Sequence, residues 1–555
     1  MCPIALQSPI CNLNVLFKAL AISVSSETDL IAKSLMKLFA VFASILVVSS
    51  LAAGSAYPLK LSAGKHHVVD QNNVPVFIHG DSAWFLTEAL NGADVDYYLS
   101  NRWVQGFNSV IMGLTLQKQD GVLSYEGDIY GQLPFTNTIA GPFTNLLSWN
   151  ERYFTNVDAV IRRAADYGIC VFAYPLYDGF NGQSGYVQMA GNPTNSLYSF
   201  GQFIGNRYKN FTNIVWVGAG DYSEPNPPNY LWNWVAAGIG SVDTNHLITA
   251  QAARPISAAS YYSNFVTLNS TYGSQFPYIE SLAAYQRTPV LASFAREPYY
   301  EYRNITGTPY DALDCRNFAW WAVLSGDAGH FFGNERQYPF APGWQAEVWS
   351  PGTTSIINVV RLMNTRPWYD CIPDANHTVV TSGYGIWGTG NYVSVTREAT
   401  GKTVMIYIPR NITTLTVDMT KISGSTANAW WYDPRTGAAT NIGSYGTTGT
   451  RSFTSPDIND WVLVIDDASL RFPLPGSPVF SLSRPGAVDG ADLTNGFRFY
   501  LSAQMPTPSA FVIEYATNLV DWLVLKTVFY TNGPVEVLDV GAGNSAVRIY
   551  RAVLP

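Results

Sequence analysis

Eight short β-forming runs alternate with helical stretches between residue 57 and about residue 370, and this repeat leaves few folds open. Between the runs, apolar residues recur at three- and four-residue spacing, as in Phe154, Val157 and Ile161, which is the period of a helix with one buried face. Eight βα units predict an α/β fold of the (β/α)8 TIM barrel type. A doubly wound open sheet is the alternative, but no Gly-rich phosphate loop follows the first run. The predicted strands are Val76–His79, Ser109–Gly113, Ile169–Tyr174, Asn213–Val217, His246–Ala250, Phe265–Asn269, Pro289–Ser293 and Gly329–Gly333.

The character of the sequence changes after Pro367-Trp368, where short strands and turn signals replace the βα repeat. Residues 57–370 are therefore expected to form the barrel, and residues 371–467 an all-β sandwich. Pro, Gly and Ser are frequent in residues 468–485, which predicts a linker. Residues 486–555 are expected to form a last small all-β module. The strand-like runs after the barrel are Tyr392–Val395, Val404–Ile408, Ala429–Tyr432, Trp461–Ile465, Phe497–Leu501, Phe511–Tyr515, Trp522–Val528 and Val547–Val553.

The segment that begins at Met36 has the layout of a secretory signal peptide. Lys37 precedes the apolar run Leu38–Val48, and small residues follow up to Ala56. The apolar run is short for a membrane span, so a lone membrane anchor is the weaker alternative. We expect residues 1–56 to be an N-terminal extension and signal peptide. The mature protein would then be secreted, periplasmic or at the cell surface, with no integral membrane span once the signal is removed.

The net charge limits the classes of binding partner that fit this chain. A net charge of −8 without a basic run argues against nucleic acid and anionic membranes, which attract clustered Lys and Arg. A weakly charged partner such as a carbohydrate fits better, and the 16 Trp and 34 Tyr supply rings that can stack on sugars or fill cores.

Of the cysteines beyond the signal, Cys170 lies in an apolar run and is expected to be buried. A bridge between Cys315 and Cys371 is one guess.

Two acidic residues stand where a barrel enzyme holds its active site, at the C-terminal ends of the strands. Cleavage of a glycosidic bond needs two carboxyl groups that face each other across it. Asp221 and Glu297 follow the fourth and seventh runs, which puts them on nearly opposite sides of one barrel mouth. A separation of about 5–5.5 Å would make Glu297 the nucleophile of a retaining enzyme and Asp221 its acid/base, whereas about 6.5–9.5 Å would mean inversion. The alternative is a helix cap and a surface ion pair.

Several motifs resemble those of one known group. They are Gly80-Asp81-Ser82-Ala83-Trp84, Gly106-Phe107-Asn108-Ser109-Val110, Asn213-Ile214-Val215-Trp216 leading to Gly220-Asp221, Pro289-Val290-Leu291 leading to Glu297-Pro298 and Tyr300-Glu301, and Ala429-Trp430-Trp431-Tyr432-Asp433-Pro434-Arg435-Thr436-Gly437. Residues 57 to about 370 resemble the apiosidase-like glycoside hydrolases, the group that includes glycoside hydrolase family 140. Residues 377–466 look like the domain named for collagen binding that follows such barrels.

The resemblance implies a barrel hydrolase with Asp221 as acid/base and Glu297 as nucleophile. The family name suggests apiose-bearing pectin side chains as one substrate. This chain has Ser293-Phe294-Ala295-Arg296 ahead of Glu297, where the family usually has a shorter approach with Gly before Glu. Glu301 therefore stays open as an alternative nucleophile.

Five further residues are candidates for lining the sugar subsite, with Trp84 as a stacking platform. A core position for Trp84 and a structural, hydrogen-bonded position for His330 are the alternatives. The five candidates are Asp81, Trp84, Tyr272, Glu301 and His330.

Other functions have weaker support. No His-Glu-x-x-His and no Gly-x-Ser-x-Gly occurs, which speaks against a metalloprotease and a serine hydrolase. We expect no metal site and no cofactor, because two carboxyl groups suffice for sugar hydrolysis. The competing function is a non-catalytic secreted protein that binds carbohydrate or matrix. The C-terminal module is the part that could attach the protein to a cell surface or matrix.

Overall fold

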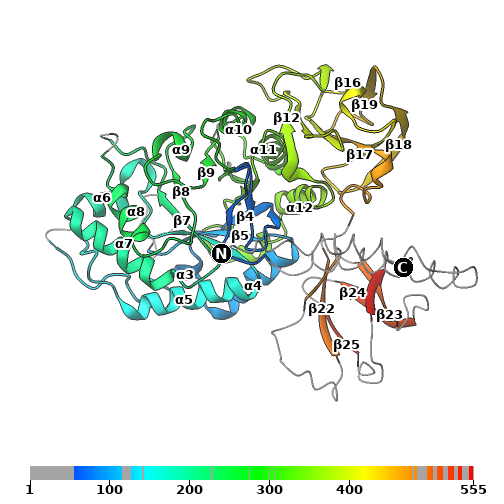
Figure 1. Cartoon of the computed structure of the whole chain (residues 1–555). Coiled ribbons are helices and arrows are strands. Elements are labelled where there is room, and N and C mark those ends of the chain that lie inside the picture. The colour runs from blue at the N-terminus through cyan, green and yellow to red at the C-terminus, as the bar shows by residue number, and fades with distance from the viewer. Residues whose placement is uncertain are drawn as a thin grey trace, which may run out of the picture. The chain divides into compact units, whose positions relative to one another are not determined.

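A computed structural model describes the chain from residue 55, apart from 116–126, 140–142, the single positions 226, 228, 274, 298 and 306, and several stretches beyond 477. Eight parallel strands form one sheet in the order β8-β7-β6-β5-β4-β11-β10-β9 (Figure 1). β4 and β11 are the first and last of these strands in the sequence, and they pair with each other, which excludes the doubly wound alternative and confirms the barrel. The strands are β4 Ile78–Ser82, β5 Ser109–Gly113, β6 Cys170–Tyr174, β7 Ile214–Ala219, β8 Ile248–Gln251, β9 Asn269–Thr271, β10 Ser293–Ala295 and β11 Gly329–Phe332.

The gap between β8 and β9 is bridged by a few hydrogen bonds. The amides of Thr267 and Leu268 donate to the Ile248 carbonyl oxygen. The Ser270 hydroxyl donates to the carbonyl oxygen of Ala250. The barrel is therefore nearly closed.

Aromatic rings fill the barrel interior, which is a packed core and not a pore. Phe172 of β6 lies 4.9 Å from the ring of Phe331 on β11 and 5.2 Å from that of Phe294 on β10. A side chain at Gly80 would collide with Phe331, since a Cβ atom there would lie 2.3 Å from the ring. The glycine of the Gly80-Asp81 motif is thus required by the interior packing.

Three strands differ from the prediction by two or more residues at each end. The run Val76–His79 was expected to be a strand, but β4 spans Ile78–Ser82 and so includes Asp81. The run Phe265–Asn269 was expected to be a strand, but β9 begins only at Asn269, because the preceding residues cover the gap beside β8. The run Pro289–Ser293 was expected to be the next strand, but β10 begins at Ser293. Pro289 has no amide hydrogen to give to a ladder, so the strand forms after it.

Helices surround the barrel (Figure 1). On α5 the predicted apolar face is confirmed, since Phe154, Val157 and Ile161 are all buried. The helices are α3 Leu86–Ala89, α4 Gly92–Val104, α5 Glu151–Asp166, α6 Gly185–Ala190, α7 Thr194–Tyr208, α8 Trp232–Gly240, α9 Ala258–Tyr261, α10 Tyr278–Tyr285, α11 Ala312–Leu324 and α12 Pro351–Asn364. Ahead of the barrel, β1 Lys60–Leu61, β2 Val68–Val69 and β3 Pro75–Val76 form a small antiparallel sheet.

A β-sandwich follows the barrel, as predicted. One sheet has the order β12-β14-β15-β20-β17-β18 and the other β13-β16-β19, and all pairings are antiparallel. Its strands are β12 Cys371–Pro373, β13 Val380–Ser382, β14 Ser394–Glu398, β15 Thr403–Ile408, β16 Thr414–Asp418, β17 Thr426–Tyr432, β18 Ala439–Gly446, β19 Thr450–Thr454 and β20 Trp461–Asp467.

The last module is all-β, also as predicted, and consists of two three-stranded sheets. Its first strand, β21, lies inside the stretch that we expected to be a linker, and it pairs with β22. The strand β25 has no counterpart in the sequence prediction. The strands are β21 Phe480–Ser483, β22 Phe497–Ala503, β23 Ser509–Ala516, β24 Leu523–Tyr530, β25 Val535–Asp539 and β26 Ile549–Val553.

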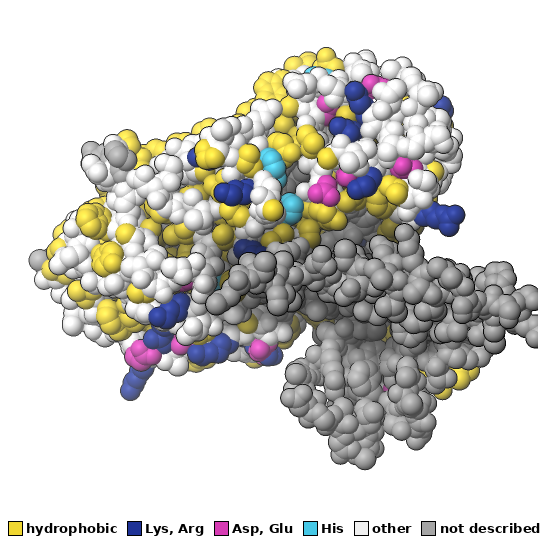
Figure 2. Space-filling model, viewed as in Figure 1, with side chains coloured by type: hydrophobic (Ala, Val, Ile, Leu, Met, Phe, Trp, Pro, Cys, Tyr) yellow, Lys and Arg dark blue, Asp and Glu magenta, His cyan; other side chains and the backbone are white. Residues whose placement is uncertain are grey.

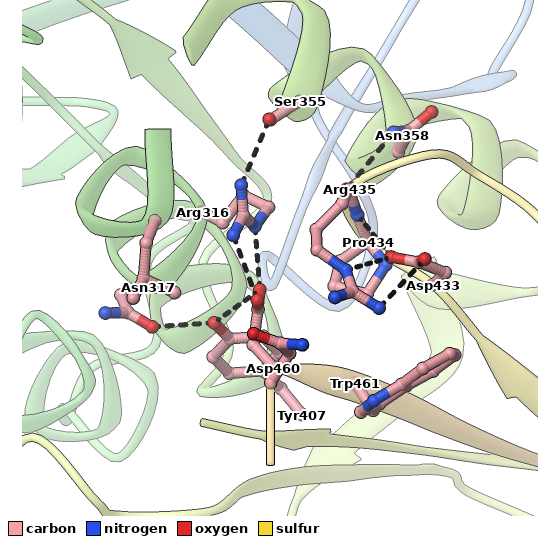
Figure 3. A network of polar contacts seen from close by, with 12 residues as sticks. Arg316, Asn317, Ser355, Asn358, Tyr407, Asp433, Pro434, Arg435, Asp460 and Trp461 are labelled. Carbon is pink, nitrogen blue, oxygen red and sulfur yellow. Dashed lines mark hydrogen bonds and ion pairs between the residues drawn. The ribbon is translucent and has the colours of Figure 1, made fainter. Parts of the chain in front are cut away.

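Barrel and sandwich share one apolar core and two buried ion pairs. Arg316 of α11 binds Asp460 through two hydrogen bonds of 2.7 and 2.9 Å, and Tyr407 of β15 adds a third donor to the same carboxylate (Figure 3). Arg366, just after α12, binds both carboxylate oxygens of Asp466 on β20 in the same bidentate geometry. The sandwich is thus fastened to the outer helices of the barrel.

Cys170 is buried, as expected, whereas Cys315 and Cys371 are free thiols and the guessed bridge is wrong. Cys315 faces a cavity beside Phe318, and the Cys371 thiol contacts the Pro367 carbonyl oxygen instead.

No helix in the described part of the chain is long and apolar enough to cross a bilayer. On the face drawn in Figure 2, the Lys and Arg side chains of the described residues are scattered and form no patch. The signal-peptide segment lies outside the described residues.

Candidate active site

A continuous chain of contacts joins Asp221 to Glu297 at the C-terminal mouth of the barrel. The Tyr177 hydroxyl donates to Asp221 Oδ2 at 3.0 Å. The ring of Tyr177 packs 4.9 Å from that of Trp84, whose indole N–H donates to Glu297 Oε1 at 2.8 Å. The two carboxyl groups that were predicted from the fourth and seventh strands therefore share one site. Tyr272 lies beside this site, because its ring packs against Arg254, which binds the Glu297 carbonyl oxygen. Burial raises the pKa of the Tyr272 hydroxyl, and the charges of Asp221 and Glu297 add to the rise.

The backbone ahead of Asp221 is folded sharply where β7 ends. Ala219 has a φ of 65°, a left-handed conformation that costs a residue with a Cβ about 1 kcal/mol or more. A Cβ atom on Gly220 would lie 2.8 Å from the Asp178 amide nitrogen, so only glycine fits there. The strained Ala219 and the bare Gly220 together turn the chain so that Asp221 faces the mouth.

An uncharged amide also positions Asp221. Gln251, the last residue of β8, donates from Nε2 to Asp221 Oδ1. Its Oε1 accepts hydrogen bonds from the Tyr174 hydroxyl at 2.8 Å and from Arg296 Nη1 at 3.1 Å. Because two donors hold the amide oxygen, the amide nitrogen can only point toward Asp221.

The Glu297 carboxyl group is buried among donors and cations. Burial and the nearby charge of Asp221 raise its pKa to about 7, and the cation of Arg296 opposes this rise. The Tyr300 hydroxyl donates to Oε1, the atom that also accepts from Trp84. Such a carboxyl group changes its ionisation near neutral pH, which is the range in which acid–base catalysts work.

Two arginines flank this carboxyl group. Arg254 donates to the backbone carbonyl oxygen of Glu297 at 2.8 Å, and its guanidinium group lies 3.7 Å from the centre of the Tyr272 ring. Arg296 is buried against the ring of Tyr174, and burial lowers its pKa to about 9. Both guanidinium groups act to lower the pKa of Glu297, so they favour its ionised form.

Two family models match consecutive parts of the chain. Residues 62–370 match the family model described as "Apiosidase-like, catalytic domain". The chain belongs to this family. Residues 372–466 match a second model, described as "Putative collagen-binding domain of a collagenase". No curated protein matches the chain.

Solved structures share the architecture of this apiosidase-like protein. One titled "Glycoside hydrolase" is 23% identical, with a TM-score of 0.65, and the match covers 75% of this chain and 97% of that one. A glycoside hydrolase family 5 structure from Bacteroides vulgatus is 24% identical, with a TM-score of 0.64, and the match covers 74% of this chain and 94% of that one. The family match identifies the chain as a glycoside hydrolase, and these structures share its fold.

Glu301, the alternative nucleophile and a candidate sugar contact, is bound by other groups of this apiosidase-like protein. Its carboxylate accepts hydrogen bonds from the Ser350 hydroxyl, the Gly352 amide and the Asn334 side chain. Ser350 is the N-cap of α12, so Glu301 fastens the loop after β10 to the positive end of that helix. These contacts give Glu301 a structural role.

Asp81 and His330, also expected to contact sugar, point elsewhere. Asp81 is fully buried and binds Arg102 at 2.6 Å, which favours a structural role. On β11, Phe331 fills the barrel, so its neighbour His330 faces the helices and lines a small cavity with Phe318. Burial lowers the pKa of His330 to about 4, which leaves the ring uncharged at neutral pH.

The sequence prediction missed Tyr177, Gln251, Arg254 and Tyr300. Gln251 and Arg254 follow the fifth predicted strand, which is a position worth inspecting in any barrel. Neither can act as the second carboxyl group of a glycosidase, so a search for acidic pairs passes over them.

Proposed function

We propose that this apiosidase-like hydrolase cleaves glycosidic bonds in a polysaccharide or in its side chains, with Asp221 and Glu297 as the two catalytic carboxyl groups. The observation that carries the proposal is the burial of Glu297 beside Asp221, in one polar site at the barrel mouth. The family match supports hydrolysis of a glycosidic bond. Apiose-bearing pectin side chains belong in the first substrate panel because of the family name.

In the proposed first step, ionised Glu297 attacks the anomeric carbon while Asp221 gives its proton to the departing glycosidic oxygen. Both hydrogen bonds from Trp84 and Tyr300 reach Oε1. We therefore assign the attack to Oε2. The bond between the sugar and its leaving group breaks as the bond to Glu297 forms.

In the second step, Asp221 removes a proton from water, and that water attacks the anomeric carbon and releases Glu297. The Gln251 amide and the Tyr177 hydroxyl hold Asp221 in place through both steps. Two displacements retain the configuration of the sugar, which proton NMR of the first product would detect. The signal-like segment at Met36 supports action outside the cytoplasm.

A non-catalytic carbohydrate- or matrix-binding protein is the rival function. The rival needs no opposed carboxyl pair, whereas here both members are held by several donors.

Release of reducing sugar from soluble pectin, arabinoxylan and galactomannan tests the proposal. We expect the native protein to release sugar from at least one of them and Glu297→Gln to lose at least about a thousandfold in kcat. Glu151→Gln, a change at an exposed carboxylate on α5, is the matched control. Full activity in Glu297→Gln would overturn the catalytic assignment, and binding without any cleavage would support the rival.

A further inference from the structure

Two large apolar side chains on a loop of the sandwich are exposed to solvent. Trp387 keeps 51% of its surface exposed, and its neighbour Ile386 keeps 62%. The loop from Tyr384 to Asn391 contains no charged residue. Next to Trp387, a Cβ atom added to Gly388 would meet nothing within 4 Å. The indole is therefore approachable from the side of that glycine.

The loop is held in one conformation. Asn391 Oδ1 accepts hydrogen bonds from the Ile386 amide and the Thr389 hydroxyl. Gly385 has a φ of 74° and lies so close to the Asn391 carbonyl that no Cβ atom would fit. The Trp387 ring itself packs against Tyr392, with 5.1 Å between ring centres. A ring fixed in this way loses little entropy when a ligand stacks on it.

The same loop contacts the barrel beside the active site. The Tyr278 hydroxyl donates to the Thr389 carbonyl oxygen at 2.9 Å, and the Tyr278 ring packs 5.1 Å from that of Trp387. Tyr278 begins α10, directly after the loop that leaves β9, and such βα loops form the active-site face of a barrel. Tyr272, at the start of that loop, packs its ring 3.7 Å from the guanidinium group of Arg254, which donates to the Glu297 carbonyl oxygen.

We propose that Trp387 and Ile386 form a distal binding site on which a sugar polymer stacks as it extends out of the active site. The inference rests on the proposed function, because it takes the polymer to be the substrate of the carboxyl pair. An uncharged loop with an open aromatic ring suits the C–H face of a sugar. The continuity with the β9–α10 loop gives the polymer a short path from one site to the other. The sandwich thus contributes to substrate binding.

Binding measured without turnover tests this separately from catalysis. In the full-length Glu297→Gln background, affinity electrophoresis in gels that contain pectin, arabinoxylan or galactomannan gives the dissociation constant of each. We expect Trp387→Ala to weaken binding of the polymer about tenfold, which is the loss of about 1.4 kcal/mol. Trp234→Ala is the matched control, because Trp234 on α8 is 46% exposed and lies in another part of the barrel. It should leave the affinity unchanged.

Other outcomes overturn the inference. Equal affinity in the Trp387 and Trp234 variants, or no binding to any polymer, would do so. Loss of binding to immobilised type I collagen in Trp387→Ala, with polymer binding intact, would assign the loop to a protein matrix instead. Steady-state kinetics of Trp387→Ala in the otherwise native chain should show a loss in kcat/KM at least fivefold greater for the polymer than for a small chromogenic glycoside. If Glu297→Gln still cleaves while Trp387→Ala loses binding, the catalytic assignment fails and the distal site stands.

Discussion

Replacing Arg316 by Met would leave the Asp460 carboxylate buried without its cation. Asp460 is 1% exposed, and the Tyr407 hydroxyl, 3.3 Å from Asp460 Oδ2, would still donate to it. Removing one partner of a buried, two-pronged pair costs about 3–5 kcal/mol. The entropy of unfolding is about 2.1 cal/mol/K per residue, so the roughly 410 residues of barrel and sandwich lose about 0.9 kcal/mol of stability per degree near Tm. We therefore expect Arg316→Met to lower Tm by about 3–6 °C.

Differential scanning calorimetry of the full chain measures this shift. Because barrel and sandwich share a core, we expect the two to unfold in one transition. Arg162→Met is the matched control, since the pair of Arg162 with Asp158 is exposed on its cationic side and is worth about 1 kcal/mol or less. The double variant Arg316→Met, Asp460→Leu should recover at least half of the loss, because it removes the stranded charge. Equal shifts in the Arg316 and Arg162 variants, or separate transitions for barrel and sandwich, would refute the reasoning.

Three further predictions concern the site. Burial and the charge of Asp221 raise the pKa of Glu297 to about 7, so the carboxyl pair loses its last proton near pH 7, and the mechanism needs one proton on the pair. We therefore expect kcat/KM to fall about tenfold per pH unit above pH 7 in a pH–rate profile, and a kcat/KM that stays constant up to about pH 9 would contradict this. Gln251→Ala removes a hydrogen bond to Asp221 and should lower kcat/KM by about 10- to 100-fold in steady-state assays, with Tm within 2 °C of native as the check on folding. Glu301→Gln should lower stability in urea by about 1–2 kcal/mol while kcat falls less than tenfold, and a loss as large as that of Glu297→Gln would return Glu301 to the chemistry.

The sequence allowed the barrel and the sandwich to be predicted because each leaves a local pattern. The predicted strand Ser109–Gly113 matches β5, and the apolar spacing on α5 follows from the helical period alone. Asp221 and Glu297 could be expected at one barrel mouth because a parallel barrel brings the ends of distant strands to one face, and their catalytic role stays a prediction.

Other features depend on orientation or on distant partners. His330 belongs to a predicted strand, yet its side chain faces the helices, because Phe331 next to it fills the barrel. Arg316 and Asp460 lie 144 positions apart in the sequence, and no local sequence pattern predicts that they pair. Gln251 acts through the two groups that hold its amide oxygen, which only the folded chain brings together.

The most direct test of the central claim is to trap the proposed covalent intermediate. The protein would be incubated with the activated 2-deoxy-2-fluoro glycoside of whichever sugar the substrate panel releases, digested, and mapped by tandem mass spectrometry. A single sugar adduct on Glu297, absent from Glu297→Gln and accumulating when Asp221 is intact, is the predicted result. An adduct on Glu301 or on Asp221 would contradict the assignment of the nucleophile. Turnover that inverts the anomeric carbon, with no adduct at any residue, would contradict the two-step mechanism.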